Sequence, residues 1–348
     1  MTVTKFNIKR RTVDEVWDVR SMVLSPKWTT DTNFQAGELT FDLLMNNSIF
    51  VPKMGDVVSF SWNGKNIFMG YIFSADYSKD GQTITCTAYD KLRYLKNQDS
   101  IVWPVSNLSQ RFERVTKAAG ITHKVINNST YKLKTEVADQ KTYFDMLQSA
   151  IEKVLSATGV RYYIRDNFGT VELLKSQQTQ TDLVLGDASL MTDFSYTQSI
   201  DQAANAIKVI REDKHSKKRK VVTYDAKTHK KNTRTETTSW TTNTTKQVDS
   251  GDHIKQWGRL QLVEKADNDL NDAQMLTKAK QLLKENNKVS QTLKLTAIGV
   301  LGIRAGTSFY FRSQELKSFG FGQKLVFPTK VTHNFSETDW TMEIEVLI

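Results

Sequence analysis

Residues 1–100 of the chain alternate apolar and polar side chains with a period of two. The clearest run is GDVVSFSWNGKNIFMGYIF at 55–73, in which Asn63-Gly64 separates two alternating stretches. Alternation places successive side chains on opposite faces of a strand, and Asn-Gly supplies the positive φ of a tight hairpin turn. Further turn signals stand at Asn46-Asn47 and Asp80-Gly81. The spacing predicts an antiparallel, barrel-like sheet for residues 1–100.

Residues 101–180 change to a helical period and predict a small α/β domain. One helix is predicted to end at Gly120 and a second at Gly159, because glycine is favoured just past a helix end. RYYIRDNFGTVELL then predicts a hairpin with its turn at Asn167 to Gly169. The apolar faces of the two helices are Leu108, Phe112 and Val115, and Phe144, Leu147, Ile151 and Val154 or Leu155.

Alternation resumes in residues 181–348 and predicts a second tube-like barrel domain. HIKQWGRLQLVEKAD at 253–267 is assigned to this strand pattern. A further helix is predicted at about 268–287, with Asn268 and Asp269 as its capping residues. Its expected apolar face is Leu270, Ala273, Leu276, Ala279 or Lys280, and Leu283. The predicted fold class is therefore β-rich α+β: two tube-like antiparallel β-barrel domains, a small α/β insert and one further helix.

The two predicted barrels repeat one order of elements. Gly37–Asp90 and Thr292–Ile348 each contain an alternating strand, a strand introduced by glycine, and a hairpin. The introducing glycines are Gly55 and Gly306, where a turn into a strand calls for positive φ. The order indicates an internal duplication. Chance similarity between two β-hairpin modules is the alternative.

Most of the positive charge lies in one segment. The chain carries a formal net charge of +10, and residues 208–246 hold 12 Lys and Arg against 4 Asp and Glu. This segment is poor in large apolar residues, so we expect a long hairpin or loop with VVTYD at 221–225 as its returning strand. A solvated excursion is favoured over phosphate or partner binding. Trp240 alone interrupts the polar run after Tyr224, which is unlike the repeated aromatic platform of a single-strand binder.

The sequence contains no recognisable catalytic or metal-binding motif. No nucleophile elbow, P-loop, zincin motif or dinucleotide fingerprint is present. Cys86 is expected to be a core thiol, and Asp76, Asp80 and Asp90 are explained by turn formation and solvation. His123, His215, His229, His253 and His333 lack metal-ligand spacing. We predict no catalytic, cofactor-binding or metal-binding residues, no cofactor and no enzymatic activity.

No run of about 18 apolar residues occurs, and MTVTKFNIKRR does not read as a signal peptide, so we expect a cytoplasmic protein without membrane insertion.

Four stretches resemble the tail hub (baseplate hub) proteins of contractile phage tails, in the PBSX prophage XkdQ/YqbQ-like family. This family is related to late control protein D and to the N-terminal hub part of type VI spike proteins. The stretches are GDVVSFSWNGKNIFMGYIFSADYSKDGQTITCTAYDKLRYL, TYFDMLQSAIEKVLSATGVRYYIRDNFGTVELL, LGDASLMTDFSYTQSIDQAANAIKVI and FPTKVTHNFSETDWTMEIEVLI. These motifs are specific in order and spacing but carry no chemistry, so they are diagnostic of architecture.

The resemblance implies a virion structural protein that assembles in the bacterial cytoplasm and ends in the tail or baseplate of a phage or tailocin. It implies a homotrimer, a pseudo-sixfold ring that joins a hexameric tail tube to a central spike. Baseplate proteins and the tape-measure protein are further expected partners. Nucleic-acid contact through 208–246 is an open but less favoured expectation.

Two other functions stay open: a basic module that binds nucleic acid or cell-surface glycan, and a cell-wall hydrolase. Deletion of residues 214–246 separates the first from a hub, and clearing of a peptidoglycan suspension would reveal the second.

Overall fold

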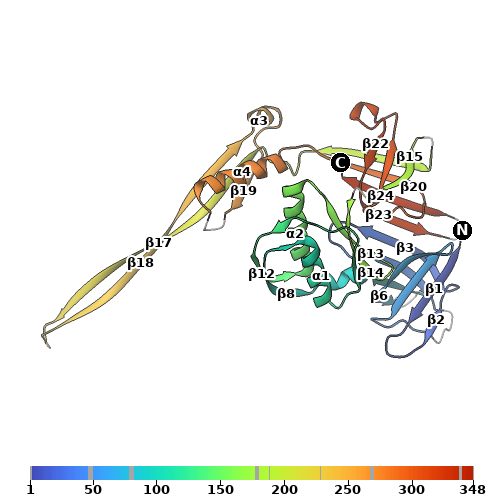
Figure 1. The fold of residues 1–348 in the computed structure, drawn as a ribbon, viewed down its shortest axis with the longest axis horizontal. Coiled ribbons are helices and arrows are strands. Elements are labelled where there is room, and N and C mark those ends of the chain that lie inside the picture. Colours follow the sequence, from blue (N-terminus) through green and yellow to red (C-terminus); the bar gives the residue numbers. More distant parts are fainter. Residues whose placement is uncertain are drawn as a thin grey trace. The chain divides into compact units, whose positions relative to one another are not determined.

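The computed structural model describes residues 2–45, 50–77, 82–176, 180–187, 189–227, 229–266, 270–336 and 339–347. The chain divides into two compact units, Met1–Tyr196 with Thr292–Ile348, and Thr197–Gln291. Figure 1 shows the elements of both units in sequence colours. We describe each unit by itself.

The first unit is built on an eleven-stranded sheet with the order β16-β20-β24-β23-β3-β4-β7-β6-β5-β1-β2. A three-stranded sheet, β15-β21-β22, accompanies it. The strands of the N-terminal part are β1 (Val3–Lys9), β2 (Val16–Asp18), β3 (Val23–Asp31), β4 (Glu38–Leu44), β5 (Val57–Trp62), β6 (Lys65–Tyr77) and β7 (Thr83–Tyr89). Those of the C-terminal part are β15 (Gln180–Gly186), β16 (Met191–Ser199), β20 (Ser290–Ile298), β21 (Ser308–Arg312), β22 (Lys324–Val326), β23 (Pro328–Phe335) and β24 (Trp340–Leu347).

The same neighbour order occurs twice in these sheets. The first repeat runs β3-β4-β7-β6-β5-β1, and the second runs β16-β20-β24-β23, continued by β22-β21-β15. The second repeat divides one strand in two, because β22 and β23 together correspond to the single long strand β6. Phe327 lies between them and β23 begins at Pro328, whose nitrogen carries no N–H with which to continue a ladder. One departure is that β1 is antiparallel to β5 while β15 is parallel to β21.

The registers of the two repeats also coincide. Gly55 N donates to Ile72 O at 2.8 Å, and Gly306 N donates to Pro328 O at 2.9 Å. A register shift follows each acceptor, between Ile72 and Ser74 and between Pro328 and Lys330. The inward residues then match pair by pair and are all buried: Leu39, Phe41, Ala88 and Cys86 in the first repeat, Leu293, Leu295, Val346 and Ile344 in the second. These coincidences support the predicted duplication over chance similarity.

Gly55 and Gly306 have the positive φ predicted for them, 84° and 87°. Asn63 and Gly64 do as well, 47° and 74°, and they join β5 to β6 as the predicted tight turn. The other predicted turns, Asn46-Asn47, Asp80-Gly81 and most of Glu337 to Asp339, lie outside the described residues.

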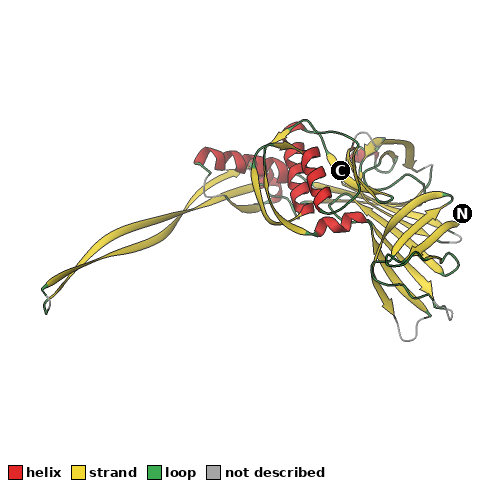
Figure 2. Cartoon of the chain, turned by 60° about the horizontal axis from the view of Figure 1, so that its bottom comes forward, coloured by secondary structure: helices red, strands yellow, loops and turns green. Residues whose placement is uncertain are grey.

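An α/β module stands between the repeats. It consists of β8 (Gln98–Trp103), β9 (Ser106–Asn107), α1 (Leu108–Ala118), β10 (His123–Val125), β11 (Lys132–Leu133), β12 (Glu136–Thr142), α2 (Tyr143–Thr158), β13 (Tyr162–Asn167) and β14 (Thr170–Lys175), preceded by the 3-10 helix Lys91–Lys96. A second short 3-10 helix, Lys317–Phe319, lies in the C-terminal part. Figure 2 shows the helices in red among the yellow strands.

Both predicted helices of the module are confirmed. Asn107 and Thr142 cap their N-termini through capping boxes, and α2 ends at Gly159 with a φ of 70°. The predicted faces, including Leu108, Phe112, Leu147 and Ile151, are buried in one core. The predicted hairpin turn at 167–169 joins β13 to β14.

The second unit is inserted between β16 and β20. It contains β17 (Ala206–Asp225), β18 (Lys230–Asp249), α3 (Gly251–Trp257), β19 (Gln261–Lys265) and α4 (Asp272–Asn286). β19 runs parallel to the first five residues of β17, and α4 packs against this base. The core is small and comprises Ala204, Ile207, Val209, Ala266, Met275 and Ala279.

Several expectations for this unit are wrong. VVTYD at 221–225 is the outer end of β17, and the returning strand is β18. HIKQW at 253–257 is helical in α3, although a strand was predicted. The helix α4 buries Met275 and Ala279, whereas Leu276 is exposed. Its cap is Asn271, and the predicted capping residues Asn268 and Asp269 lie outside the described residues.

The predicted closed barrels are not found among the described residues. The two repeats share one open sheet instead, because β23 of the second repeat pairs with β3 of the first. The strand-rich fold with few helices agrees with the predicted β-rich class.

Candidate assembly surfaces

The junction between the two repeats is a strand pair formed within one chain. β3 and β23 are antiparallel, from Lys330 opposite Asp31 to Asn334 opposite Lys27 (Figure 1). Thr32 N donates to Thr329 O at 2.8 Å, and the hydroxyls of Thr29 and Thr332 lie 3.0 Å apart. The junction thus joins β23 of the second repeat to β3, the strand at one end of the neighbour order of the first repeat.

Among the described residues, the two edges that correspond to this junction, on β6 and on β16, each lack a second strand neighbour. β6 corresponds to β23, and its Phe73–Tyr77 part has a strand neighbour on one side only, β7, among the described residues. β16 corresponds to β3 and stands at the end of the sheet order. The described residues form one such junction, between β23 and β3. They also present the two corresponding edges, on β6 and on β16, at separate places. Open edges of this kind are templates for pairing with another chain.

Aromatic side chains mark the junction and its open counterpart. His333 of β23 is 2% exposed and stacks on Trp28 of β3, with ring centroids 5.5 Å apart. In the register of the repeats Tyr77 of β6 takes the place of His333, and it is 59% exposed. Phe73, the residue at the register shift, is also partly exposed. The open edge thus displays apolar surface where the internal junction buries it.

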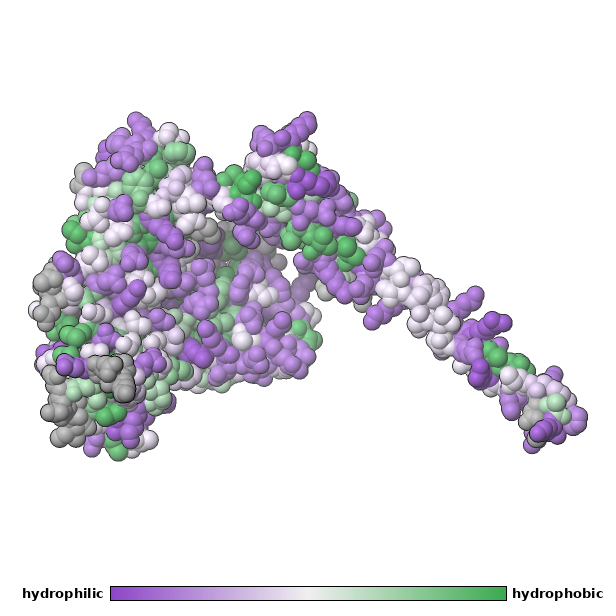
Figure 3. Space-filling view, turned by 180° about the vertical axis from the view of Figure 1, so that it is seen from behind, coloured by the Kyte–Doolittle hydropathy of each residue, from purple (hydrophilic) through white to green (hydrophobic). Residues whose placement is uncertain are grey.

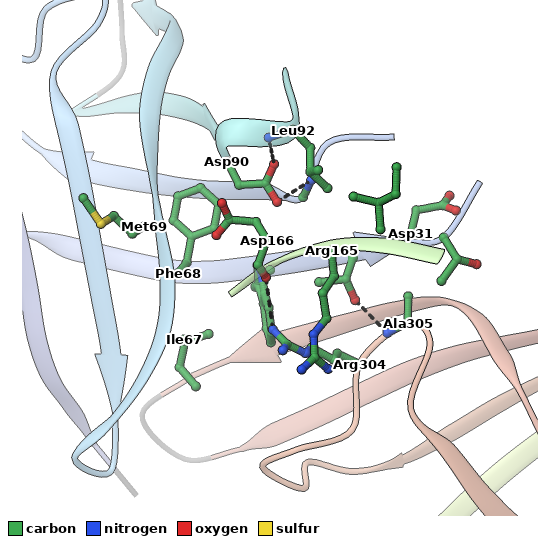
Figure 4. Close-up of a pocket in the computed structure, with 15 residues that line it drawn as sticks. Asp31, Ile67, Phe68, Met69, Asp90, Leu92, Arg165, Asp166, Arg304 and Ala305 are labelled. Carbon is green, nitrogen blue, oxygen red and sulfur yellow. Dashed lines mark hydrogen bonds between the residues drawn. The ribbon is translucent and has the colours of Figure 1, made fainter. Parts of the chain in front are cut away.

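Buried charges hold the α/β module against both repeats. Figure 4 shows Asp90, which follows β7, beside Asp166 of β13 and Arg304 of the second repeat. Asp90 accepts from Gly37 N and Leu92 N, each at 2.9 Å, and Arg304 Nη1 donates to Asp166 O at 3.2 Å. Burial, and then the nearby Asp166, raises the pKa of Asp90 well above its usual range. The expectation that solvation explains Asp90 is therefore wrong.

The neighbouring groups respond to the same burial. Desolvation raises the pKa of Asp166 to about 6 and lowers that of Arg304 to about 10, so Arg304 is still a cation at neutral pH. Arg165 and Glu172 form a salt bridge at 2.9 Å in the same hairpin. Asp166 Oδ1 accepts from Gly169 N at 2.7 Å, whereas its Oδ2 is buried without a hydrogen-bond partner among the described residues. The cluster connects three parts of the chain, which indicates a structural joint.

The described residues offer no metal cluster of three or more His, Cys, Asp or Glu side chains. Cys86 is buried, as predicted, and burial raises the pKa of its thiol to about 12, far from that of a nucleophile. The histidines lie apart: His123 in the α/β module, His333 at the junction, His253 in α3, and His215 and His229 on the hairpin β17–β18. Within the described ranges, no helix is long and apolar enough to cross a membrane.

This fold is shared with a prophage tail protein. The 43 kDa tail protein of prophage MuSo2 from Shewanella oneidensis matches with a TM-score of 0.66 at 13% identity, covering 98% of this chain and 97% of its own. The chain therefore has the fold of that class of tail protein.

The family is defined by sequence. The YQBQ-like family model matches residues 26–234 and 230–347, and the chain belongs to this family. Two relatives from Bacillus subtilis are each 28% identical: the uncharacterized protein YqbQ, over 86% of this chain and 83% of its own length, and the phage-like element PBSX protein XkdQ, over 84% and 81%. The resemblance predicted from the four sequence stretches is confirmed.

Proposed function

We propose that the chain is a structural protein of a phage tail, and specifically the baseplate hub of a contractile tail or tail-like particle. In this proposal three copies form a ring that joins a hexameric tail tube to a central spike. The family relationship to a phage-like element protein and the tail-protein fold support the general role. The division into residues 1–100, 101–180 and 181–348 is retained as part of the proposal.

The observation that carries the proposal is the β3–β23 junction together with the two edges that correspond to it, on β6 and β16, which lack a second strand neighbour among the described residues. If β16 of one chain pairs with β6 of the next, the contact copies the β23–β3 pair within each chain. Such a contact is heterologous, because it joins two different surfaces. A heterologous contact closes into a ring when the rotation that relates one chain to the next is a whole-number fraction of a full turn. The second repeat would then meet the first repeat of the next chain as it meets the first repeat of its own.

Two repeats in each of three chains present six similar units around the ring. A hexameric tube can dock on the six repeats, while a trimeric spike can dock on the features that occur once per chain, such as the α/β module. Duplication thus reconciles threefold and sixfold neighbours. Closure of the six repeats would also supply a closed barrel, which the described residues of one chain do not form.

The proposed role involves assembly and no catalysis. The proposed location is the tail or baseplate of the finished particle after assembly in the host cytoplasm. Proposed partners are the tube protein, the spike protein, other baseplate proteins and the tape-measure protein.

Co-expression with the tube and spike proteins of the same particle tests this role. We expect a stable complex containing three copies of this chain for each trimeric spike, measured by native mass spectrometry. A complex with a single copy, or the absence of any complex with either protein, would rule the hub out. The alternative of a cell-wall hydrolase predicts clearing of peptidoglycan, for which the described residues offer no metal cluster and the sequence no catalytic motif.

A further inference from the structure

The hairpin β17–β18 continues well beyond the core of its unit. The base of β17 pairs with β19 as far as Ile210, whereas residues 214–224 and 231–241 pair only with each other among the described residues. We call these two segments the outer hairpin. All but Val221 of its residues are exposed, and Figure 3 shows mostly hydrophilic surface along it. An isolated two-stranded ribbon is marginally stable, so a ribbon of this length is suited to a partner.

Cross-strand register sorts the charges of the outer hairpin onto two faces. Residues that pair directly share a face, and alternate pairs share the same face. One set of pairs, from Lys214 with Thr241 to Tyr224 with Lys231, contains four lysines and no acidic residue. We call this set the lysine face; its lysines are Lys214, Lys218, Lys220 and Lys231, and its hydroxyl residues are Ser216, Thr233, Thr235, Thr237, Ser239 and Thr241.

The opposite set of pairs has a different character. It contains Lys217, Arg219 and Arg234, but Arg234 forms a salt bridge with Glu236 at 2.6 Å. His215 and Trp240 stack on this face with centroids 5.5 Å apart. We call this set the mixed face. The seven positive side chains of the outer hairpin divide four to three between the faces, and its one acidic side chain, Glu236, lies on the mixed face. The lysine face therefore carries a net charge of +4 and the mixed face +2.

We propose that the lysine face binds the phosphate backbone of duplex nucleic acid without sequence preference. Lysines and hydroxyls are the side chains that contact phosphates, and a two-stranded β-ribbon is narrow enough to enter a major groove. Tyr224 is the one aromatic residue on this face, so it offers no stacking platform for a single strand.

A second copy of the hairpin fits less well, because it would set lysines against lysines, which repel. An acidic protein surface is the other alternative, and a parent chain that does not bind DNA at low salt is the outcome that would favour it.

The test compares two variants of the full chain that each lose three positive charges. Lys214→Gln, Lys218→Gln and Lys220→Gln alter the lysine face, and Lys217→Gln, Arg219→Gln and Arg234→Gln alter the mixed face. Binding of a fluorescent duplex DNA of random sequence is followed by anisotropy between about 50 and 200 mM salt. Circular dichroism checks that both variants fold as the parent does.

We expect the parent chain to bind more weakly as salt rises. The lysine-face variant should lose about tenfold or more in affinity at the lower salt, and its slope of log affinity against log salt should fall by up to about 3 units. The mixed-face variant should stay within about threefold of the parent. Equal losses of affinity in both variants would show that binding depends only on net charge, and would overturn the proposal. The absence of DNA binding by the parent chain at about 50 mM salt would also overturn it. This test is independent of the hub: a trimer that does not bind DNA contradicts only the present inference.

Discussion

The internal junction between β3 and β23 holds the His333 ring in its neutral protonation state. Its Nδ1 accepts from Trp340 Nε1 at 3.2 Å, so Nε2 carries the proton and donates to Ile303 O at 2.7 Å. The ring lies among Trp28, Phe335 and Trp340. Desolvation lowers its pKa from 6.5 to about 4. The neutral ring is therefore part of the packing between the repeats.

This lowered pKa predicts a pH dependence of stability. Between pH 6.5 and about 4 the unfolded chain binds a proton at His333 that the folded chain excludes, so acidification through this window lowers the free energy of unfolding. The loss is up to roughly 3 kcal/mol. The raised pKa of Asp166, about 6, acts in the opposite direction in the same window. Urea unfolding of the parent and of His333→Gln at a series of pH values isolates the histidine: the advantage of the parent should shrink below pH 6.5. An advantage that is constant with pH would contradict the neutral, buried ring.

The two corresponding glycines provide a matched pair of substitutions. Gly55 and Gly306 share a positive φ, but a Cβ at Gly55 would meet nothing within 4 Å, while one at Gly306 would lie 2.3 Å from the Tyr163 ring. We expect Gly55→Ala to lower the free energy of unfolding by roughly 1 kcal/mol from backbone strain. Gly306→Ala should cost a further ~1–3 kcal/mol, because the ring must move. Denaturant unfolding of both variants measures this, and equal costs would show that the Tyr163 contact is unimportant. The sequence predicted the shared φ, but it gave no sign of Tyr163, which lies far away in the chain.

At the scale of elements, the open edge of β6 makes a specific prediction. Tyr77 occupies the position that His333 holds at the internal junction, and a lysine there places a charge where the proposed contact buries a ring. We expect Tyr77→Lys to weaken trimer formation about tenfold or more, measured by sedimentation equilibrium. Val137→Lys is the control, since Val137 is 72% exposed on β12 of the α/β module. Equal weakening by both variants would exclude the edge as the contact.

Elements with one buried face were predicted well from sequence. The helix α2 has an apolar stripe and a glycine stop, and both of its ends follow from local chemistry. The outer hairpin is exposed on both faces, so no alternation marks where β17 ends, and VVTYD was assigned to the wrong strand. The pairing of β3 with β23 joins segments some 300 residues apart, as the contact of Thr29 with Thr332 shows, and no local pattern encodes it. The same holds for the Asp90 cluster, whose members come from three parts of the chain.

For the whole molecule, the central claim is that one chain carries two copies of a unit whose mutual contact can repeat between chains. Among the residues that the structure describes, β3 and β23 join the repeats, and the matching edges of β6 and β16 have no second strand neighbour. A dimer built from these edges would hold four repeats, whereas three chains hold the six that match a hexameric tube. The number of chains in the assembly is therefore the quantity on which the account depends.

Light scattering of the purified chain across a concentration series, at low and high salt, measures that number most directly. The account predicts a species of three times 39.8 kDa that persists at high salt, because strand pairing and apolar burial are screened far less than surface charge. A dimer, or a monomer over the whole series, would contradict it.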